Sequence, residues 1–271
     1  MIIRDDGSSD TTLAAISGFT VDGRIALAPP SGRTRSAAQN FLTLIRDSSA
    51  AAFDYVAFAD QDDVWYSDKL SRACRLLQTA DSVGYSSATV AEWEDGRSTL
   101  LGQSAAATPA DFLFEGAGQG CTFVLRADFY AQVRDLVTVH ETMTRAIHYH
   151  DWLIYALARA MGRKWIFDPA PSVHYRQHGS NDTGARGRLN GIAKRLSLIR
   201  GRWYRNQLIA IAEICAAAAA ANTFVDTWRA ILLANGGWPR RVRIAWFCMR
   251  NGRRRRTDTM VLIVAALAGW I

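Results

Sequence analysis

The chain carries the stretch Tyr55-Val56-Ala57-Phe58-Ala59-Asp60-Gln61-Asp62-Asp63-Val64-Trp65, in which mostly apolar residues run directly into three carboxylates. An unbroken apolar segment bounded by polar residues is typical of a buried parallel strand, although periodicity alone does not distinguish it from a buried helix. In an open α/β sheet, ligands bind just beyond the carboxyl ends of the strands. The pattern therefore predicts that Asp60, Asp62 and Asp63 lie at the floor of a pocket.

The three carboxylates also indicate a candidate cation site. Carboxylates this close together repel one another unless a cation or a proton lies between them. No cysteine or histidine stands beside them in the sequence. The ligand set would thus be all oxygen, which suits Mg²⁺ or Mn²⁺ rather than Zn²⁺. The alternative is an acidic turn that caps the following helix, and the cluster by itself leaves both interpretations open.

Strand-like and helix-like segments alternate around this stretch. We expect strands near residues 1–4, 23–28, 55–59 and 83–90, and helices near 10–16, 36–49 and 67–77. Such alternation is typical of βαβ units and predicts an α/β fold with a mostly parallel, doubly wound sheet. Neither a GxGxxG nor a GxxxxGK[ST] phosphate loop occurs, so the sequence favours neither a dinucleotide-binding fold nor a P-loop protein.

Charge is unevenly distributed over the 271 residues, which carry a formal net charge of +7. The last third is rich in arginine, including the run 253–256, and is interspersed with tryptophan. Such a region either binds an anionic partner (a membrane surface, a nucleic acid or a phosphate-rich substrate) or is simply solvated. The four cysteines are widely spaced, which favours a reduced compartment, and the apolar run 260–271 is too short to span a bilayer.

Three further polar segments carry candidate functional residues, and each has an ordinary structural alternative. The glycine-rich segment 115–121 could bring backbone close to a ligand or could be a loop entering a strand. Asp151 opens an expected helix, where it could serve the helix dipole or point into a cleft. His178 lies in a polar loop, and a lone histidine is more often structural than a ligand.

Taken together, these segments resemble family-2 glycosyltransferases with the nucleotide-diphospho-sugar transferase (GT-A) fold, and more closely their rhamnosyltransferase-like branch. The resemblance covers roughly residues 1–180 and rests on five segments: Asp5-Asp6-Gly7-Ser8-Ser9-Asp10, Asp60-Gln61-Asp62-Asp63-Val64-Trp65 with Asp68-Lys69-Leu70, Gly120-Cys121-Thr122, His150-Asp151-Trp152 and Tyr175-Arg176-Gln177-His178-Gly179. We expect a GT-A domain over residues 1–186 and a helical appendage over 187–271. Members of the family carry an apolar first strand ahead of the Asp-Asp-Gly segment, and we expect this chain to lack it.

The resemblance implies a role for each matching residue. Asp151 corresponds to the catalytic base. A divalent metal, Mg²⁺ or Mn²⁺, would be held by Asp60, Asp62, Asp63 and His178. The nucleotide-sugar would be contacted by Asp5, Asp6, Asp60, Gln61, Gly120, Trp152 and Arg176.

The function implied is an inverting transfer of a sugar, with rhamnose as the family guess, from a dTDP- or UDP-linked donor. The acceptor would be a hydroxyl of a glycan or a lipid-linked molecule in cell-surface polysaccharide synthesis, in the cytoplasm or at the inner face of the plasma membrane. The tail would be either an interfacial helix on anionic lipid or a helical cap with core aromatics, and nucleic acid is a disfavoured partner. Two other classes stay open: a metal-dependent phosphohydrolase or nucleotidyltransferase, and a truncated, non-catalytic binding remnant.

Overall fold

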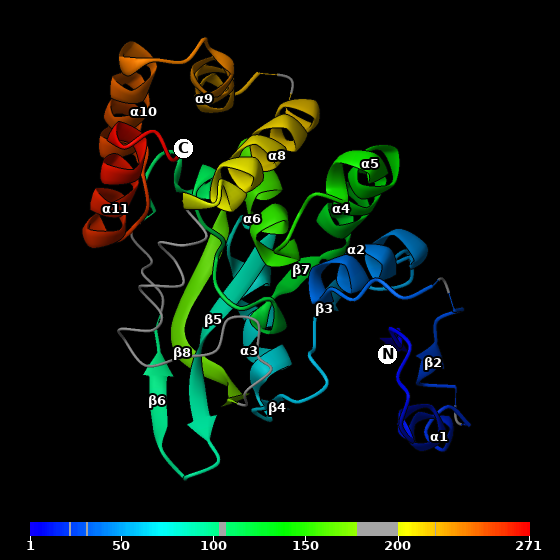
Figure 1. The fold of residues 1–271 in the computed structure, drawn as a ribbon. Coiled ribbons are helices and arrows are strands. Elements are labelled where there is room, and N and C mark those ends of the chain that lie inside the picture. The colour runs from blue at the N-terminus through cyan, green and yellow to red at the C-terminus, as the bar shows by residue number, and fades with distance from the viewer. Residues whose placement is uncertain (22, 31, 103–106, 178–199, 220) are drawn as a thin grey trace.

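A computed structural model describes residues 1–21, 23–30, 32–102, 107–177, 200–219 and 221–271 (Figure 1). The strands are β1 (Ile2–Ile3), β2 (Ala26–Leu27), β3 (Tyr55–Ala57), β4 (Val64–Trp65), β5 (Gly84–Trp93), β6 (Ser98–Leu101), β7 (Val124–Arg126) and β8 (Trp165–Gln177). The helices are α1 (Thr12–Ser17), α2 (Ala37–Asp47), α3 (Lys69–Thr79), α4 (Ala127–Val139), α5 (Glu141–Thr144), α6 (His150–Ala160), α8 (Trp203–Ala218), α9 (Thr223–Leu233), α10 (Trp238–Asn251) and α11 (Arg256–Leu267). Two short 3₁₀ helices, η1 (Asp111–Leu113) and η2 (Gly120–Thr122), precede β7.

The main sheet is mixed. Its strand order is β3-β7-β5-β8-β4, with β6 paired to β5. Among the described residues, only the β5–β8 pair is parallel in this sheet, and its other pairs are antiparallel. The α/β fold with a helical C-terminal region is confirmed, whereas the mostly parallel sheet expected from the alternation of elements is replaced by a mixed one. The reason is that β4 and β7 are short antiparallel strands that the alternation of longer segments did not predict.

The strand that leads into the acidic turn differs from its prediction. β3 lies at the edge of the sheet, is half-buried and pairs antiparallel with β7, so it is not a buried parallel strand. The N-terminal strands β1 and β2 pair with each other in a separate two-stranded parallel sheet. In Figure 1 this unit lies to one side of the main sheet, on the side of α2.

β8 is one long strand that runs through Pro169 and Pro171. Proline cannot donate a hydrogen bond to a neighbouring strand and is tolerated where pairing is irregular. The register of β8 against β5 shifts around Ala88, opposite Pro171. The N–H of Ala170 donates instead to Oδ1 of Asp168, at 2.9 Å. The strand therefore continues through its prolines by way of an irregular segment.

Helices cover both faces of the main sheet. α3 packs through Ala73 and Leu77 against Tyr85 of β5 and Val124 of β7. The next residue of β7, Leu125, points to the opposite face, where α2, α4 and α6 contribute to the main core. The acidic turn between β3 and β4 thus lies at the rim of a sheet whose two faces are both packed.

The C-terminal helices share the main core. Leu208 of α8 is fully buried in the same cluster as Leu153 of α6. Trp228 of α9 stacks on Phe247 of α10, with ring centroids 5.1 Å apart. The domain boundary expected at residues 186–187 lies outside the described residues. Within the described ranges, every helix falls short of the length and apolarity needed to cross a membrane.

Candidate active site

The acidic turn brings two carboxylates and a thiol together. Asp60 and Asp63 follow β3, and Cys121 belongs to η2, just before β7. Because β3 and β7 are neighbours, with Phe58 N–H donating to the Phe123 carbonyl oxygen at 3.2 Å, the two segments meet at one edge. One ligand atom from each of Asp60, Asp63 and Cys121 lies within 4.8 Å of the others.

The carboxylate of Asp63 lacks a strong hydrogen-bond donor. Both of its oxygens are buried, and neither accepts a hydrogen bond from a nitrogen or oxygen donor within the described ranges; the Cys121 thiol, a weak donor, faces it. Burial raises the pKa of Asp63 to about 6. Burial, followed by the charges of Asp63, Asp62 and Asp151, raises the pKa of Asp60 to about 7. The group is not the all-oxygen set that the sequence predicted, because Cys121 belongs to it. Burial raises the pKa of the Cys121 thiol, so the two carboxylates are the charged ligands, and carboxylate oxygens suit a hard divalent cation such as Mg²⁺ or Mn²⁺.

The other two predicted metal ligands, Asp62 and His178, are not part of this group among the described residues. Asp62 is half-buried in the same turn but does not belong to the group of converging ligand atoms found among the described residues. Its backbone oxygen accepts a hydrogen bond from Nε of Arg176 at 2.5 Å. His178 lies outside the described residues. Their roles as metal ligands stay predictions.

A buried lysine counterbalances the acids. The side chain of Lys69, at the start of α3, is fully buried. Its Nζ donates to the carbonyl oxygen of Cys121 at 2.5 Å and lies 3.3 Å from the ring centroid of Trp65. Burial lowers its pKa to about 7, while the nearby charges of Asp63 and Asp60 oppose that shift. Sequence reasoning noted Lys69 only as part of a matching segment, and its spacing of four residues from Trp65 was the available signal.

Asp151 opens α6 and lies close enough to Asp60 to raise the pKa of that carboxyl. Its Oδ1 accepts the N–H of Trp152 at 2.7 Å. Burial raises the pKa of Asp151 to about 6. The structure therefore brings the predicted base next to the predicted metal ligand, although the two residues are far apart in the sequence.

Gly120 forms the wall beside Asp151. A Cβ atom at this position would lie 2.6 Å from Nε2 of His150 and 3.3 Å from Cβ of Asp151, so only glycine fits without a shift. Nε2 of His150 is buried and has no hydrogen-bond partner in the part of the chain that the structure describes. The His150 ring stacks on Phe41 of α2 at a centroid distance of 4.3 Å. Burial lowers the pKa of His150 to about 3, which keeps the imidazole neutral near pH 7.

Asp5 and Asp6 are engaged in their own loop. Oδ2 of Asp5 accepts the N–H groups of Gly7 and Ser8 at 2.8 and 2.9 Å. The carboxylate of Asp6 accepts two backbone N–H groups from residues 34 and 35, at 2.6 and 2.7 Å. These hydrogen bonds contribute to lowering the pKa of both carboxyls. The two residues thus shape the loop after β1, and nucleotide contact by them stays a prediction.

The remaining nucleotide-sugar candidates lie around the rim or behind the site. Gln61 is exposed at the tip of the acidic turn, and Arg176 is exposed on β8. Trp152 is buried, with its indole N–H donating to the carbonyl oxygen of Phe112 at 2.8 Å and its ring stacked on Tyr204. Trp152 therefore anchors the first turn of α6 in the core.

The chain is similar to known proteins both in sequence and in structure. No protein-family model matches the sequence. The chain is 34% identical over 218 residues to the dTDP-rhamnosyl transferase RfbG of Shigella flexneri, covering 80% of this chain and 75% of that protein. A crystal structure of S. aureus TarS 1–349 in complex with UDP superposes with a TM-score of 0.53 at 12% identity, covering 97% of this chain and 73% of that one. A crystal structure of S. aureus TarS superposes with a TM-score of 0.50 at 12% identity, covering 99% of this chain. This chain spans about half the length of that TarS chain (49%).

The structural likeness to TarS shows the fold of the nucleotide-diphospho-sugar transferases, and the sequence relative shows a glycosyltransferase, as the resemblance predicted. Within that class, the chain belongs to the rhamnosyltransferase-like family that includes RfbG. This confirms the predicted enzyme class. It also favours glycosyl transfer over the phosphohydrolase or nucleotidyltransferase alternative, for which the acid cluster alone left room.

Proposed function

We propose that this chain transfers a rhamnosyl residue from dTDP-rhamnose to a hydroxyl of a glycan or lipid-linked acceptor in cell-surface polysaccharide synthesis, at the cytoplasmic face of the membrane. The donor is supported by the 34% identity to a dTDP-rhamnosyl transferase. A UDP-linked donor is the second candidate, because UDP occupies the structurally similar TarS 1–349.

The observation that carries the proposal is the buried carboxylate of Asp63 beside Asp60, which has no nitrogen or oxygen donor among the described residues. Asp60 and Asp63, with Asp62 and His178 as further candidates, would hold Mg²⁺ or Mn²⁺. When bound, such a cation neutralises charge on a departing nucleoside diphosphate. The ammonium of Lys69 moderates the repulsion between the acids and fixes the backbone of Cys121 against them.

Asp151 is the proposed general base. Its raised pKa of about 6 leaves it mostly ionised at neutral pH and still basic enough to accept a proton from a sugar hydroxyl. The N–H of Trp152 fixes one of its oxygens, and Gly120 packs closely against its Cβ. With one base opposite the leaving group, the displacement inverts the anomeric centre and needs no covalent sugar–enzyme species.

Donor contacts by Asp5, Asp6, Gln61 and Arg176 are part of the proposal. We place Trp152 behind Asp151 as a support, because its indole is buried against Phe112. The hydrogen-bonded carboxylates of Asp5 and Asp6 are proposed to hold the backbone of the loop that faces the nucleotide.

The test is an Asp151→Asn variant assayed for transfer from dTDP-rhamnose and from a UDP-linked sugar. We expect kcat to fall by about 10²- to 10⁴-fold, the usual contribution of a general base, while dTDP affinity is retained. Asp135→Asn, an exposed acid on α4, is the control. Transfer by the wild type from UDP-sugars alone would replace the donor, and full activity of Asp151→Asn would refute the role of the base.

A further inference from the structure

The six arginines between residues 240 and 254 divide into two groups. Arg240 donates to the last carbonyl oxygens of α9, and Arg241 donates to a carbonyl oxygen at the end of α11. Arg253 and Arg254 bind the acids Glu115 and Asp111 of the main body. These four side chains form hydrogen bonds or ion pairs within the protein, so they do not explain the basic character of the exposed surface.

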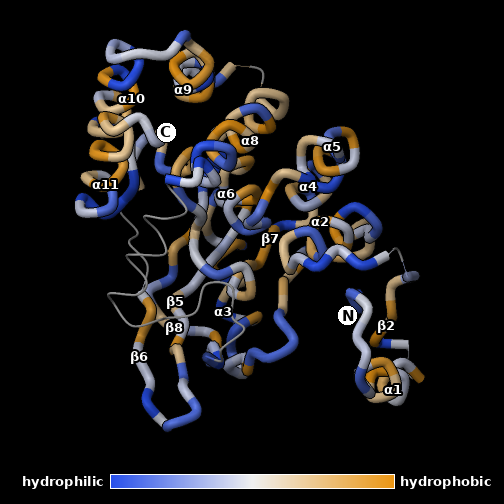
Figure 2. Tube along the Cα trace, viewed as in Figure 1, coloured by the Kyte–Doolittle hydropathy of each residue, from blue (hydrophilic) through white to orange (hydrophobic). Residues whose placement is uncertain are grey.

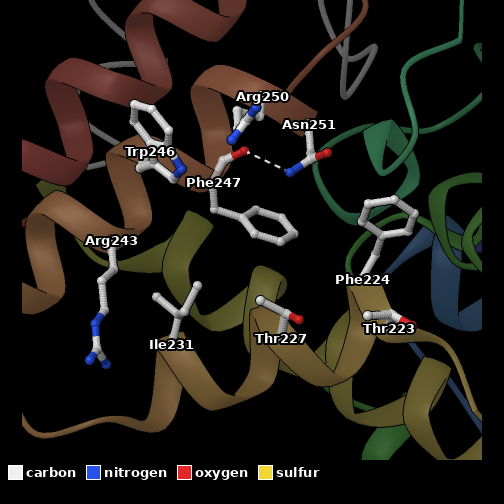
Figure 3. Close-up of a pocket in the computed structure, with 9 residues that line it drawn as sticks. All are labelled: Thr223, Phe224, Thr227, Ile231, Arg243, Trp246, Phe247, Arg250 and Asn251. Atoms are coloured by element: carbon white, nitrogen blue, oxygen red, sulfur yellow. Dashed lines mark hydrogen bonds between the residues drawn. The ribbon is translucent and has the colours of Figure 1, made fainter.

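Arg243 and Arg250 form the second group. Neither has an acidic partner within the residues that the structure describes, and both are exposed. They lie about two helical turns apart on α10, and hence on the same side of it. Both line a pocket of about 310 Å³ between α9 and α10, in which the Phe247 ring points toward α9 (Figure 3).

The pocket wall is apolar and continues into an exposed apolar row. Its other lining residues include Phe224, Ile231, Trp246 and Phe247. Trp246 is 56% exposed and belongs to a row of exposed apolar side chains at helical spacing on α10: Trp238, Val242, Trp246 and Met249. Met260 and Val264 are exposed on α11, which packs against α10. Figure 2 shows hydrophobic segments within both helices. Several exposed apolar side chains on one helix indicate an interaction site.

We propose that this surface, defined by Arg243, Trp246, Arg250 and the apolar row of α10, binds the phosphate headgroups of anionic bilayer lipids. Guanidinium groups match phosphate oxygens in geometry and charge, and tryptophan favours the boundary between headgroups and acyl chains. Apolar residues beside unpaired arginines on one helix are the pattern of an interfacial helix. The charge complementarity of the two arginines selects an anionic rather than a neutral lipid surface.

The helix that carries this surface leads into a contact with the loop beside Asp151. Arg254, which follows the end of α10, donates to the carbonyl oxygen of Gly116 at 2.6 Å. The loop that begins at Gly116 ends at Gly120, which packs against Asp151. Arg254 thus links the end of α10 to the segment that leads to the proposed base.

The experiment is co-sedimentation of the full chain with phosphatidylcholine vesicles, with and without phosphatidylglycerol. We expect binding to the anionic vesicles only, weakened by salt. The double variant Arg243→Gln/Arg250→Gln should bind about thirtyfold more weakly, because each arginine near an anionic surface contributes about fivefold. Trp246→Ala should weaken binding as well. The charge-matched control is Arg97→Gln/Arg145→Gln, which removes two charges from exposed ion pairs elsewhere and should leave binding unchanged.

Four outcomes would overturn the proposal: no binding to anionic vesicles, equal binding to neutral vesicles, equal loss in the control pair, or complete competition by inorganic phosphate, which would indicate a site for soluble phosphate. A dimer in light scattering that Trp246→Glu converts to monomer, without vesicle binding, would assign the surface to a second copy of the chain. Transfer to a soluble acceptor should be unchanged in the double variant, so failure of this proposal is distinguishable from failure of the proposed function.

Discussion

Two groups of buried and half-buried acids lie within the same fold and differ in their partners. In the first, here the Asp111 cluster, the fully buried Asp111 accepts hydrogen bonds from the Tyr155 hydroxyl at 2.8 Å, from Arg159 at 3.0 Å and from Arg254 at 2.8 Å. Glu115 beside it accepts the N–H of Arg254 at 2.6 Å. Each buried charge has an opposite charge, so this cluster is complete.

In the second, the Asp60 cluster of Asp60, Asp63 and Asp151, the carboxyls face mainly one another. Lys69 is the buried cation beside them, and Asp63 has no nitrogen or oxygen donor in the described part of the chain. All three acids have a pKa raised by burial. The contrast indicates that the Asp111 cluster holds the C-terminal helices on the core, whereas the Asp60 cluster requires a proton or a bound cation.

The largest stability effect should come from the complete cluster. Asp111→Asn keeps the shape but leaves Arg159 and Arg254 without their buried counter-charge. Breaking a buried ion pair from one side typically costs about 3–5 kcal/mol, and we expect a loss of that size in the free energy of unfolding from urea titration. Asp128→Asn, in an exposed pair with Arg126, should change it by less than about 0.5 kcal/mol. A loss below about 1 kcal/mol for Asp111→Asn would show that the cluster does not hold the C-terminal helices on the core.

A smaller loss of stability is expected from a change in the loop 115–120, which joins the two groups of acids. Gly120→Ala places a methyl group 2.6 Å from Nε2 of His150, so the loop or α6 must move. Overpacking of this kind costs about 1–3 kcal/mol. Transfer activity should fall as well, because Asp151 lies beside the added methyl group. Gly236→Ala, which meets nothing within 4 Å, should retain both stability and activity, and equal behaviour of the two variants would contradict the close fit.

The pH dependence of stability should also distinguish the Asp60 cluster from the Asp111 cluster. In chelator, the raised pKa values of Asp60, Asp63 and Asp151 mean that the folded chain binds more protons than the unfolded chain between about pH 4 and pH 6–7. The lowered pKa of His150 acts in the opposite direction over about pH 3–6.5 but involves a single group. Stability should therefore fall as pH rises through this window, measured by thermal melts at fixed ionic strength. Asp63→Asn should make the decline shallower, and an unchanged slope would count against the raised pKa of Asp63.

Much of the site could be predicted because its chemistry is local in sequence. The acidic turn after β3 and Asp151 at the start of a helix are recognisable from their neighbours, and the order of the segments pointed to the family. The proximity of Asp60 and Asp151, however, depends on η2 and Gly120 lying between them. No pattern of neighbouring residues in the sequence predicts that contact.

Other features depend on long-range pairing and were missed for that reason. Arg254 is 143 residues from Asp111, so the sequence showed only a basic run and an unremarkable acid. The direction of β7 and the continuity of β8 follow from partners in the sheet rather than from local propensity. Asp5 and Asp6 matched a family segment, but their hydrogen bonds to backbone could not be read from that match.

The most direct test of the contrast is thermal unfolding of the wild type, Asp63→Asn and Asp111→Asn, each in chelator and in Mn²⁺. We predict that Mn²⁺ raises the melting temperature of the wild type, as any ligand of the folded state does. Asp63→Asn should melt no lower than the wild type in chelator and lose the Mn²⁺-dependent rise. Asp111→Asn should melt lower in both and keep the rise. A Mn²⁺-dependent rise that survives in Asp63→Asn would contradict the assignment of the Asp60 cluster as the cation site.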